Sequence, residues 1–178
     1  MQVNLDNTKE YDKVIMYIDS KNGIFQNTTD FKFYINIGEP IKNIAFIKLM
    51  NIQVITNIVA SYTHDDIFYI ELNNYDRVIS YIKNSLNEEF NVIKYFENVQ
   101  YTGDVLPNSK KSSRVSYNSS SIDWSDPSVY FLNPPEPTLH RFDITLRDKD
   151  YQIINKNNID ALKMSICLYY INKNILHK

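Results

Sequence analysis

Histidine and carboxylate side chains are the first residues to test for chemistry, and their spacing predicts neither a metal site nor a catalytic set. The three histidines, His64, His140 and His177, lie 76 and 37 residues apart. No His-x-His or His-Glu-x-x-His pattern therefore places two of them on one strand or helix. The run from His64 to Asp66 offers ligand types in a row, but a solvated turn between two strands explains it. We expect no metal site of the cupin type.

Three further patterns predict no reactive group. The run from Asp123 to Asp126 lacks the ordered oxygen ligands and the glycine of a calcium loop. Cys167 lies in an apolar run, where a buried and inert thiol is expected. Gly23, Gly38 and Gly103 have no neighbouring glycine, so no phosphate-binding loop is present. Because no motif places an acid beside a base, we expect no enzyme, no cofactor and no small-molecule substrate.

A basic and aromatic group in the polar stretch 102–128 is the candidate interaction surface. Its members are Lys110, Lys111, Arg114, Tyr117 and Trp124. Basic side chains beside aromatic rings suit contact with a protein partner or with nucleic acid. Trp124 is the only tryptophan and lies in a polar segment, where an exposed indole favours a protein interface. We predict an interface at these five residues, and the alternative is a charged loop in solvent.

Length and composition predict one globular domain. The chain has 178 residues, 43% hydrophobic and 22% charged, with 19 basic against 21 acidic side chains. A net charge of −2 lacks the basic excess of a nucleic-acid-binding protein, so no specific nucleic acid is expected as a partner. Met1–Glu10 is polar and predicts no secretory signal. The apolar runs are too short for a membrane helix and do not support contact with an inner membrane.

The elements that position these residues are mostly strands. The chain holds 24 Ile, 14 Tyr and 9 Phe, residue types that suit a pleated, half-buried surface. Strict alternation at Phe31–Ile37 predicts a strand that Gly38-Glu39-Pro40 ends. Composition and alternation predict further strands at 14–20, 44–55, 67–72, 91–101, 139–147 and 161–171, with shorter ones at 115–117, 129–132 and 151–154.

Four segments do not read as core strand. Apolar residues spaced by three and four, behind the N-cap Asp76, predict a helix over 76–87. The stretch 102–128 is Ser-rich and is expected to be a long exposed loop. Three prolines within 133–137 predict a rigid extended lead to the next strand. Residues 1–13 are expected to form a polar N-terminal arm, and 14–178 the domain.

Two groups of segments resemble a known family. The first is a strand ending Tyr17-Ile18-Asp19-Ser20, then Phe31–Ile35, then Pro40–Ile44 with a long strand to Ile55. The second is the proline-rich 133–137 followed by Leu139–Asp150. Their order is similar to that of single jelly-roll penton and minor capsid proteins of large nucleocytoplasmic DNA viruses and their virophages. The similarity covers about half of the chain. Residues 75–130 match nothing in that family, and Tyr151 stands where the family has a glycine.

The resemblance implies a fold, a role and partners. The fold would be an all-β single jelly-roll sandwich of two four-stranded antiparallel sheets, here with one short helix inserted. The role would be that of a virion structural protein at the icosahedral vertex. It would associate with itself as a pentamer and with the major capsid protein, in a capsid assembled in the host cytoplasm. A minor capsid, or cement, protein beneath or between the major capsomers is the first alternative. A lectin-like binding module using the 102–128 loop is the second.

Overall fold

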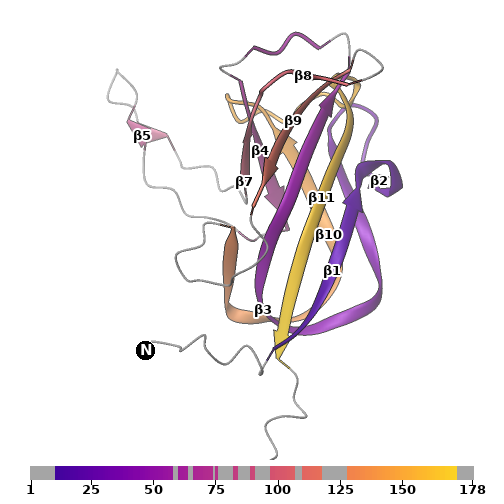
Figure 1. The fold of residues 1–178 in the computed structure, drawn as a ribbon, viewed down its shortest axis with the longest axis vertical. Helices are drawn as coiled ribbons and strands as arrows, with labels where there is room; N and C mark the ends of the chain where they lie inside the picture. The colour runs from indigo at the N-terminus through magenta and orange to yellow at the C-terminus, as the bar shows by residue number, and fades with distance from the viewer. Residues whose placement is uncertain are drawn as a thin grey trace, which may run out of the picture.

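The computed structural model of the chain describes residues 11–57, 60–63, 66–73, 75, 82–83, 89–90, 97–106, 110–117 and 128–171. Within these ranges the protein is all-β and mostly antiparallel, with one curled nine-stranded sheet and a separate two-stranded sheet (Figure 1). The strands are β1 (Tyr11–Asp19), β2 (Ile24–Phe25), β3 (Lys32–Thr56), β4 (Ile67–Leu72), β5 (Ile82–Lys83), β6 (Glu89–Phe90), β7 (Glu97–Gln100), β8 (Asp104–Val105), β9 (Lys111–Ser116), β10 (Val129–Arg147) and β11 (Ile159–Ile171). Two short 3₁₀ turns, η2 (Ser20–Asn22) and η3 (Lys156–Asn158), are the helical segments of the described chain.

Two long strands, β3 and β10, organise the sheet by changing partners along their length. The first part of β3 pairs with β2 and with the end of β10, and its last part lies between β11 and β9. The end of β10 also pairs with β4, and β4 in turn pairs with β7. β1 pairs with β11, so strands from the two ends of the described chain lie side by side (Figure 1).

Each long strand has a corner where its pairing breaks. Between Asn36 and Ile41, β3 places four residues against one residue of β10. Between Phe131 and Glu136, β10 likewise places four residues, including two prolines, against one residue of β3. Such irregularities let a strand turn from one layer to another. The prediction that Gly38–Pro40 ends a strand was wrong, because β3 continues through these residues. The pairing of β3 with β10 is nevertheless interrupted there.

The core follows from alternation along these strands. In β4, Phe68, Ile70 and Leu72 are buried while the residues between them are partly exposed. Phe33 and Phe142 lie fully buried in the same cluster, which joins residues of β3, β4, β10 and β11. Because one cluster links strands from every part of the sheet, the described strands enclose one core.

Two predictions about the middle of the chain were wrong. The predicted helix 76–87 fails at its described residues, because Ile82–Lys83 forms β5 and pairs with Glu89–Phe90. Ile82 and Phe90 are direct cross-strand partners, so a hairpin pairs two members of the apolar set that suggested a helix. The predicted exposed loop 102–128 contains β8 and β9. Ser112 and Ser113 are buried because β9 fills a place beside β3, and the Ser113 hydroxyl accepts from the Thr102 amide at 3.0 Å.

The remaining predicted strands appear with shifted ends. β1 begins at Tyr11, so its first three residues come from the segment expected to be an N-terminal arm. The predicted strand 91–101 is present as β7, and 161–171 begins earlier, as β11. The predicted hairpin strand 151–154 is reduced to a single bridge between Arg147 and Ile153.

Candidate functional site

The structure does not gather the predicted interface residues into one surface. Lys111 and Arg114 are exposed on β9, opposite Thr56 and Gln53 of β3. Because they are three residues apart in a strand, their side chains point to opposite faces of the sheet. Trp124 lies outside the described residues. Lys110 and Tyr117 have structural partners instead, as the next two paragraphs describe.

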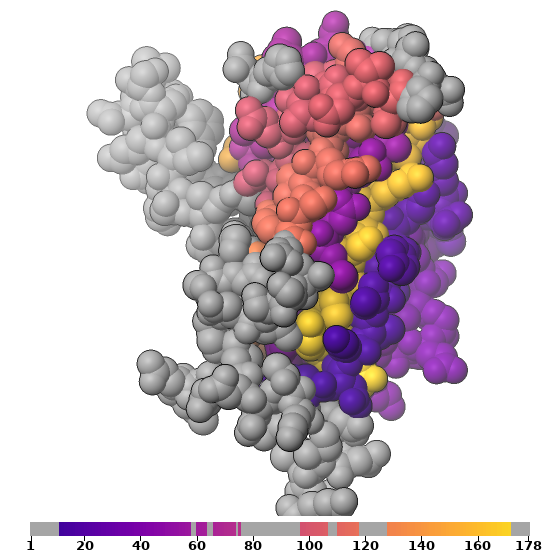
Figure 2. Space-filling model, viewed as in Figure 1, coloured from indigo at the N-terminus to yellow at the C-terminus, as the bar shows by residue number. Residues whose placement is uncertain are grey.

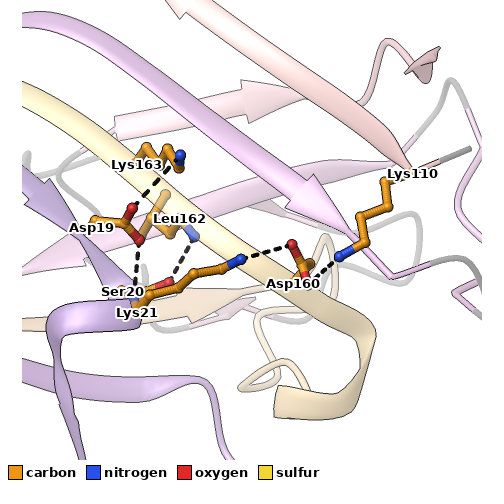
Figure 3. Close-up of polar contacts among 7 residues, drawn as sticks. All are labelled: Asp19, Ser20, Lys21, Lys110, Asp160, Leu162 and Lys163. Carbon is orange, nitrogen blue, oxygen red and sulfur yellow. Dashed lines mark hydrogen bonds and ion pairs between the residues drawn. The ribbon is translucent and has the colours of Figure 1, made fainter. Parts of the chain in front are cut away.

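Lys110 joins the start of β9 to the start of β11 through a shared carboxylate. Its Nζ lies 2.5 Å from Asp160 Oδ1, and Lys21 Nζ lies 3.4 Å from Asp160 Oδ2 (Figure 3). The hydrogen bond from Lys110 lowers the pKa of Asp160 below its ordinary value, and Lys21 adds to this effect. Nearby, the buried Ser20 hydroxyl accepts from the Leu162 amide at 2.9 Å (Figure 3). Asp160 therefore holds η2 and β9 against β11.

Tyr117 points inward, to a buried carboxylate. Its hydroxyl donates to Glu97 Oε2 at 3.1 Å, and the Tyr130 hydroxyl donates to the same oxygen. The other oxygen, Glu97 Oε1, accepts from the Asn98 amide at 2.8 Å. Burial of Glu97 is tolerated because both of its oxygens are hydrogen-bonded. Tyr117 thus ties β9 to β7, and only its sequence position had suggested an interface.

An aromatic cluster lies on the sheet face opposite the core. The Phe46 ring stacks on Tyr169, with 4.4 Å between ring centroids, and makes edge or tilted contacts with Tyr11 and Phe131 at 5.1 and 5.4 Å. Phe46 does not belong to the main core cluster. Phe131 is 37% exposed. Strands β1, β11, β3 and β10 each supply one ring, so this cluster arises only from their pairing.

The same face of β1 carries two exposed large apolar side chains. Ile15 is 44% exposed and Tyr17 is 81% exposed. Figure 2 shows this face, on which β1, β11, β3 and β9 follow one another across the molecule. Apolar side chains in such a row are a feature of surfaces that bind other proteins. The sequence does not predict this row, because the β1 segment has the pattern of a short apolar run, which does not show which side chains stay exposed.

Cys167 and Lys48 lie buried on the same face, as cross-strand neighbours. Burial raises the pKa of the Cys167 thiol, and its hydrogen bond with Tyr169 and the charges of Lys13 and Lys48 partly oppose that effect. The thiol is therefore mostly protonated at neutral pH, as expected for an inert cysteine.

Two carboxylates on the outer face of the β4 and β10 layer are engaged in pairs. A groove of about 800 Å³ there is lined by Glu71, Tyr75, Glu136 and Arg141, among others. Arg147 Nε lies 2.7 Å from Glu71 Oε1, and the Tyr75 hydroxyl donates to Glu136 Oε2 at 3.2 Å. Burial raises the pKa of Tyr75, which keeps it a hydrogen-bond donor. These pairs link β4 to β10.

The histidine and aspartate motifs are only partly described. His140 is exposed on β10, whereas His64, Asp65, His177 and Asp123–Asp126 lie outside the described residues. Asp66 accepts from the Thr63 amide at 2.7 Å and pairs with Lys149 at 3.1 Å. The Thr63 bond, with the help of Lys149, lowers the pKa of Asp66. Among the described residues no three His, Cys, Asp or Glu side chains come together as metal ligands.

Comparison with known proteins adds no family. No protein-family model matches the chain, and no curated protein matches it. In the part of the chain that the structure describes, no helix is long and apolar enough to cross a membrane.

Proposed function

We propose that this chain is a virion structural protein, a single jelly-roll capsid subunit that forms the icosahedral vertex by self-association. One observation carries the proposal, namely the order in which the strands pair. The order β1, β11, the last part of β3, then β9 supports one four-stranded sheet of a jelly roll. The order of the first part of β3, then β10, β4 and β7 supports the other.

The two corners support the same fold. In a jelly roll, one continuous segment supplies a strand to each sheet, and the chain must bend between them. The break in β3 near Gly38–Pro40 and the break in β10 at its prolines lie where such bends are needed. The apolar row on β1 supports a role in assembly, because it offers a protein-binding surface outside the described core cluster.

A vertex role requires a ring of five copies. Rings form through heterologous contacts, in which two different patches of one subunit meet. The test is light scattering over a concentration series, where a mass five times the 21.0 kDa chain mass is expected at high concentration. A single-chain mass throughout would contradict the vertex role and leave a minor capsid protein that assembles only on its lattice.

Charge reversal tests whether β9 takes part in the ring. Lys111→Glu and Arg114→Glu change exposed side chains that pair with no described carboxylate. If loops at this end form the contact, each variant reduces the pentamer fraction at a fixed concentration. Lys42→Glu is the matched control, because Lys42 is equally exposed but lies at the β3 corner. An equal effect of all three variants would indicate a general charge effect and no contact at β9.

A further inference from the structure

β1 is an edge strand of the described sheet. It stands at the end of the strand order and pairs only with β11, and within the described ranges no other strand lies along its opposite edge. Beside it, a groove of about 880 Å³ separates Val14 and Met16 from the β3 corner. An exposed edge of nine residues presents backbone donors and acceptors that a strand of another chain can satisfy.

The outward side chains of β1 have a self-complementary order. Lys13, Ile15, Tyr17 and Asp19 alternate with Val14, Met16 and Ile18, which face the core side. Read along the strand, the outer row is therefore basic, apolar, apolar and acidic. When two copies of such a row run antiparallel, each base meets an acid and each apolar residue meets the other apolar residue.

We propose that two copies of this chain pair through their β1 edges, antiparallel, about a twofold axis at Met16. Lys13 then faces Asp19 of the second copy, and Ile15 faces its Tyr17. This covers the two most exposed apolar residues of the strand. Lys13 makes no ion pair within the described residues. Asp19 Oδ1 accepts from the Lys21 amide at 2.9 Å, and Asp19 Oδ2 lies 3.7 Å from Lys163 Nζ, so this second oxygen is the one that would face Lys13. The contact extends the sheet of one copy into the other.

The alternative registers fit less well. An axis at Ile15 places Lys13 against Tyr17 of the second copy. An axis at Tyr17 places Lys13 opposite a residue that lies beyond the end of the second copy's β1. An axis between two residues would turn the core-facing row of one copy to the outer face of the other. Among these registers only the axis at Met16 joins both charges and both apolar residues.

This contact is distinct from the proposed ring. A twofold contact is isologous, since the same patch serves both copies, whereas a fivefold ring is heterologous. The two can therefore fail separately. A pentamer without the β1 contact would overturn this inference alone, and a dimer without a pentamer would overturn the vertex role alone.

Charge exchange between two variants is the first test. In Lys13→Glu both copies present acids at the contact, and in Asp19→Lys both present bases, so each variant alone should dimerise about tenfold more weakly than the native chain. In a one-to-one mixture, the introduced glutamate of one variant meets the introduced lysine of the other, and the native Asp19 meets the native Lys13. The mixture should recover the native affinity, measured by sedimentation equilibrium. No recovery, with native melting temperatures for both variants, overturns the contact.

Disulfide formation tests the register. The background is Cys167→Ser, because Ile15 lies opposite Cys167 in the same chain and a cysteine at 15 would pair with it. In that background, Ile15→Cys mixed with Tyr17→Cys should give a cross-linked heterodimer under mild oxidation, seen by intact mass. Each variant alone should stay uncross-linked. Cross-linking of Ile15→Cys with itself would place the axis at Ile15 and overturn the proposed register, and no cross-link in any sample would overturn the contact.

Discussion

Asp160 shows how one side chain can tie distant segments together. Its carboxylate is shared by Lys110 and Lys21, which belong to segments far apart in the sequence. The two nearby ammonium groups stabilise the ionised form of Asp160 in the fold. Lys110, one of the predicted interface residues, thus also pairs with a carboxylate of its own chain.

The lowered pKa of Asp160 predicts a pH-dependent contribution to stability. A carboxyl whose pKa is lower in the folded state than in the unfolded state stabilises the fold at pH values above its ordinary pKa of 3.8. This contribution is lost as the pH falls through the folded pKa. Asp160→Asn should therefore lower the free energy of unfolding at neutral pH by less than about 1 kcal/mol. The difference should shrink as pH falls below 3.8. Urea unfolding at a series of pH values measures it.

The control for this experiment is Asp150→Asn, since Asp150 is exposed in a turn and makes no ion pair with a described residue. It should change stability little at any pH. If the difference between Asp160→Asn and the native chain were the same in acid as at neutral pH, the shared ion pair would not contribute.

Tyr151 holds a backbone conformation that side chains rarely adopt. Its φ is 63°, in the turn after β10. Its ring stacks on Tyr69 with 4.7 Å between centroids, and its carbonyl accepts from Arg147 Nη1 at 2.9 Å. The stacking contact stabilises the ring of a residue whose positive φ is unfavourable for any side chain.

Two variants at residue 151 separate the ring from the dihedral angle. Tyr151→Gly and Tyr151→Ala both lose the contact with Tyr69, but only glycine adopts positive φ without steric cost. The glycine variant should be more stable than the alanine variant by about 1 kcal/mol in chemical denaturation. Asp150 has no positive φ. At this position the glycine variant should therefore be less stable than the alanine variant, because glycine loses more chain entropy on folding. An alanine variant at 151 as stable as the glycine variant would contradict the strain.

At the scale of elements, close packing of β2 and the preceding turn against β3 depends on a missing side chain. A Cβ on Gly23 would collide with the ring of Phe33, which is fully buried. A Cβ on Gly38, at the β3 corner, would meet nothing. The two glycines therefore have different physical roles, although both stand in turn-like sequence.

Alanine substitutions test this difference. Gly23→Ala should reduce the free energy of unfolding by about 1–3 kcal/mol, because the Phe33 ring must move within a packed core. Gly38→Ala should leave stability unchanged or raise it slightly, since it restricts the unfolded chain. Thermal melts of the two variants beside the native chain measure both effects. Equal destabilisation by the two substitutions would mean that the turn at Gly23 does not pack as described.

At the scale of the whole molecule, the long ladders join segments that are distant in sequence. β1 pairs with β11, and β3 pairs with β9, β10 and β11. Chain closure over such distances is slow, because entropy is lost before the contacts form. The native sheet is therefore completed only when the two ends of the described chain meet.

This arrangement predicts slow refolding. From denaturant, the chain should regain its β-sheet signal in milliseconds to seconds, as all-β domains with distant pairings do. Stopped-flow circular dichroism measures it at a protein concentration low enough to keep the chain monomeric. Refolding in microseconds would indicate that local hairpins dominate, contrary to the observed pairing.

Much of the fold was determined by the sequence itself. Alternation and β-branched composition identified the strands at 44–55, 67–72 and 139–147, because a half-buried strand must alternate whatever its partners are. The extended backbone of the proline-rich segment 133–137, which lies inside β10, was also visible, since φ restrictions act within a few residues.

Only the tertiary structure decided the partners. The Ser-rich β9 became a partly buried strand because β3 offers it an edge, and Ile82 joined a hairpin because Phe90 lies across from it. The aromatic cluster of Tyr11, Phe46, Phe131 and Tyr169 and the open edge of β1 depend on which strands are neighbours. Period and propensity act over a few residues and do not choose a strand's partner, which in the pairing of β1 with β11 lies more than a hundred positions away.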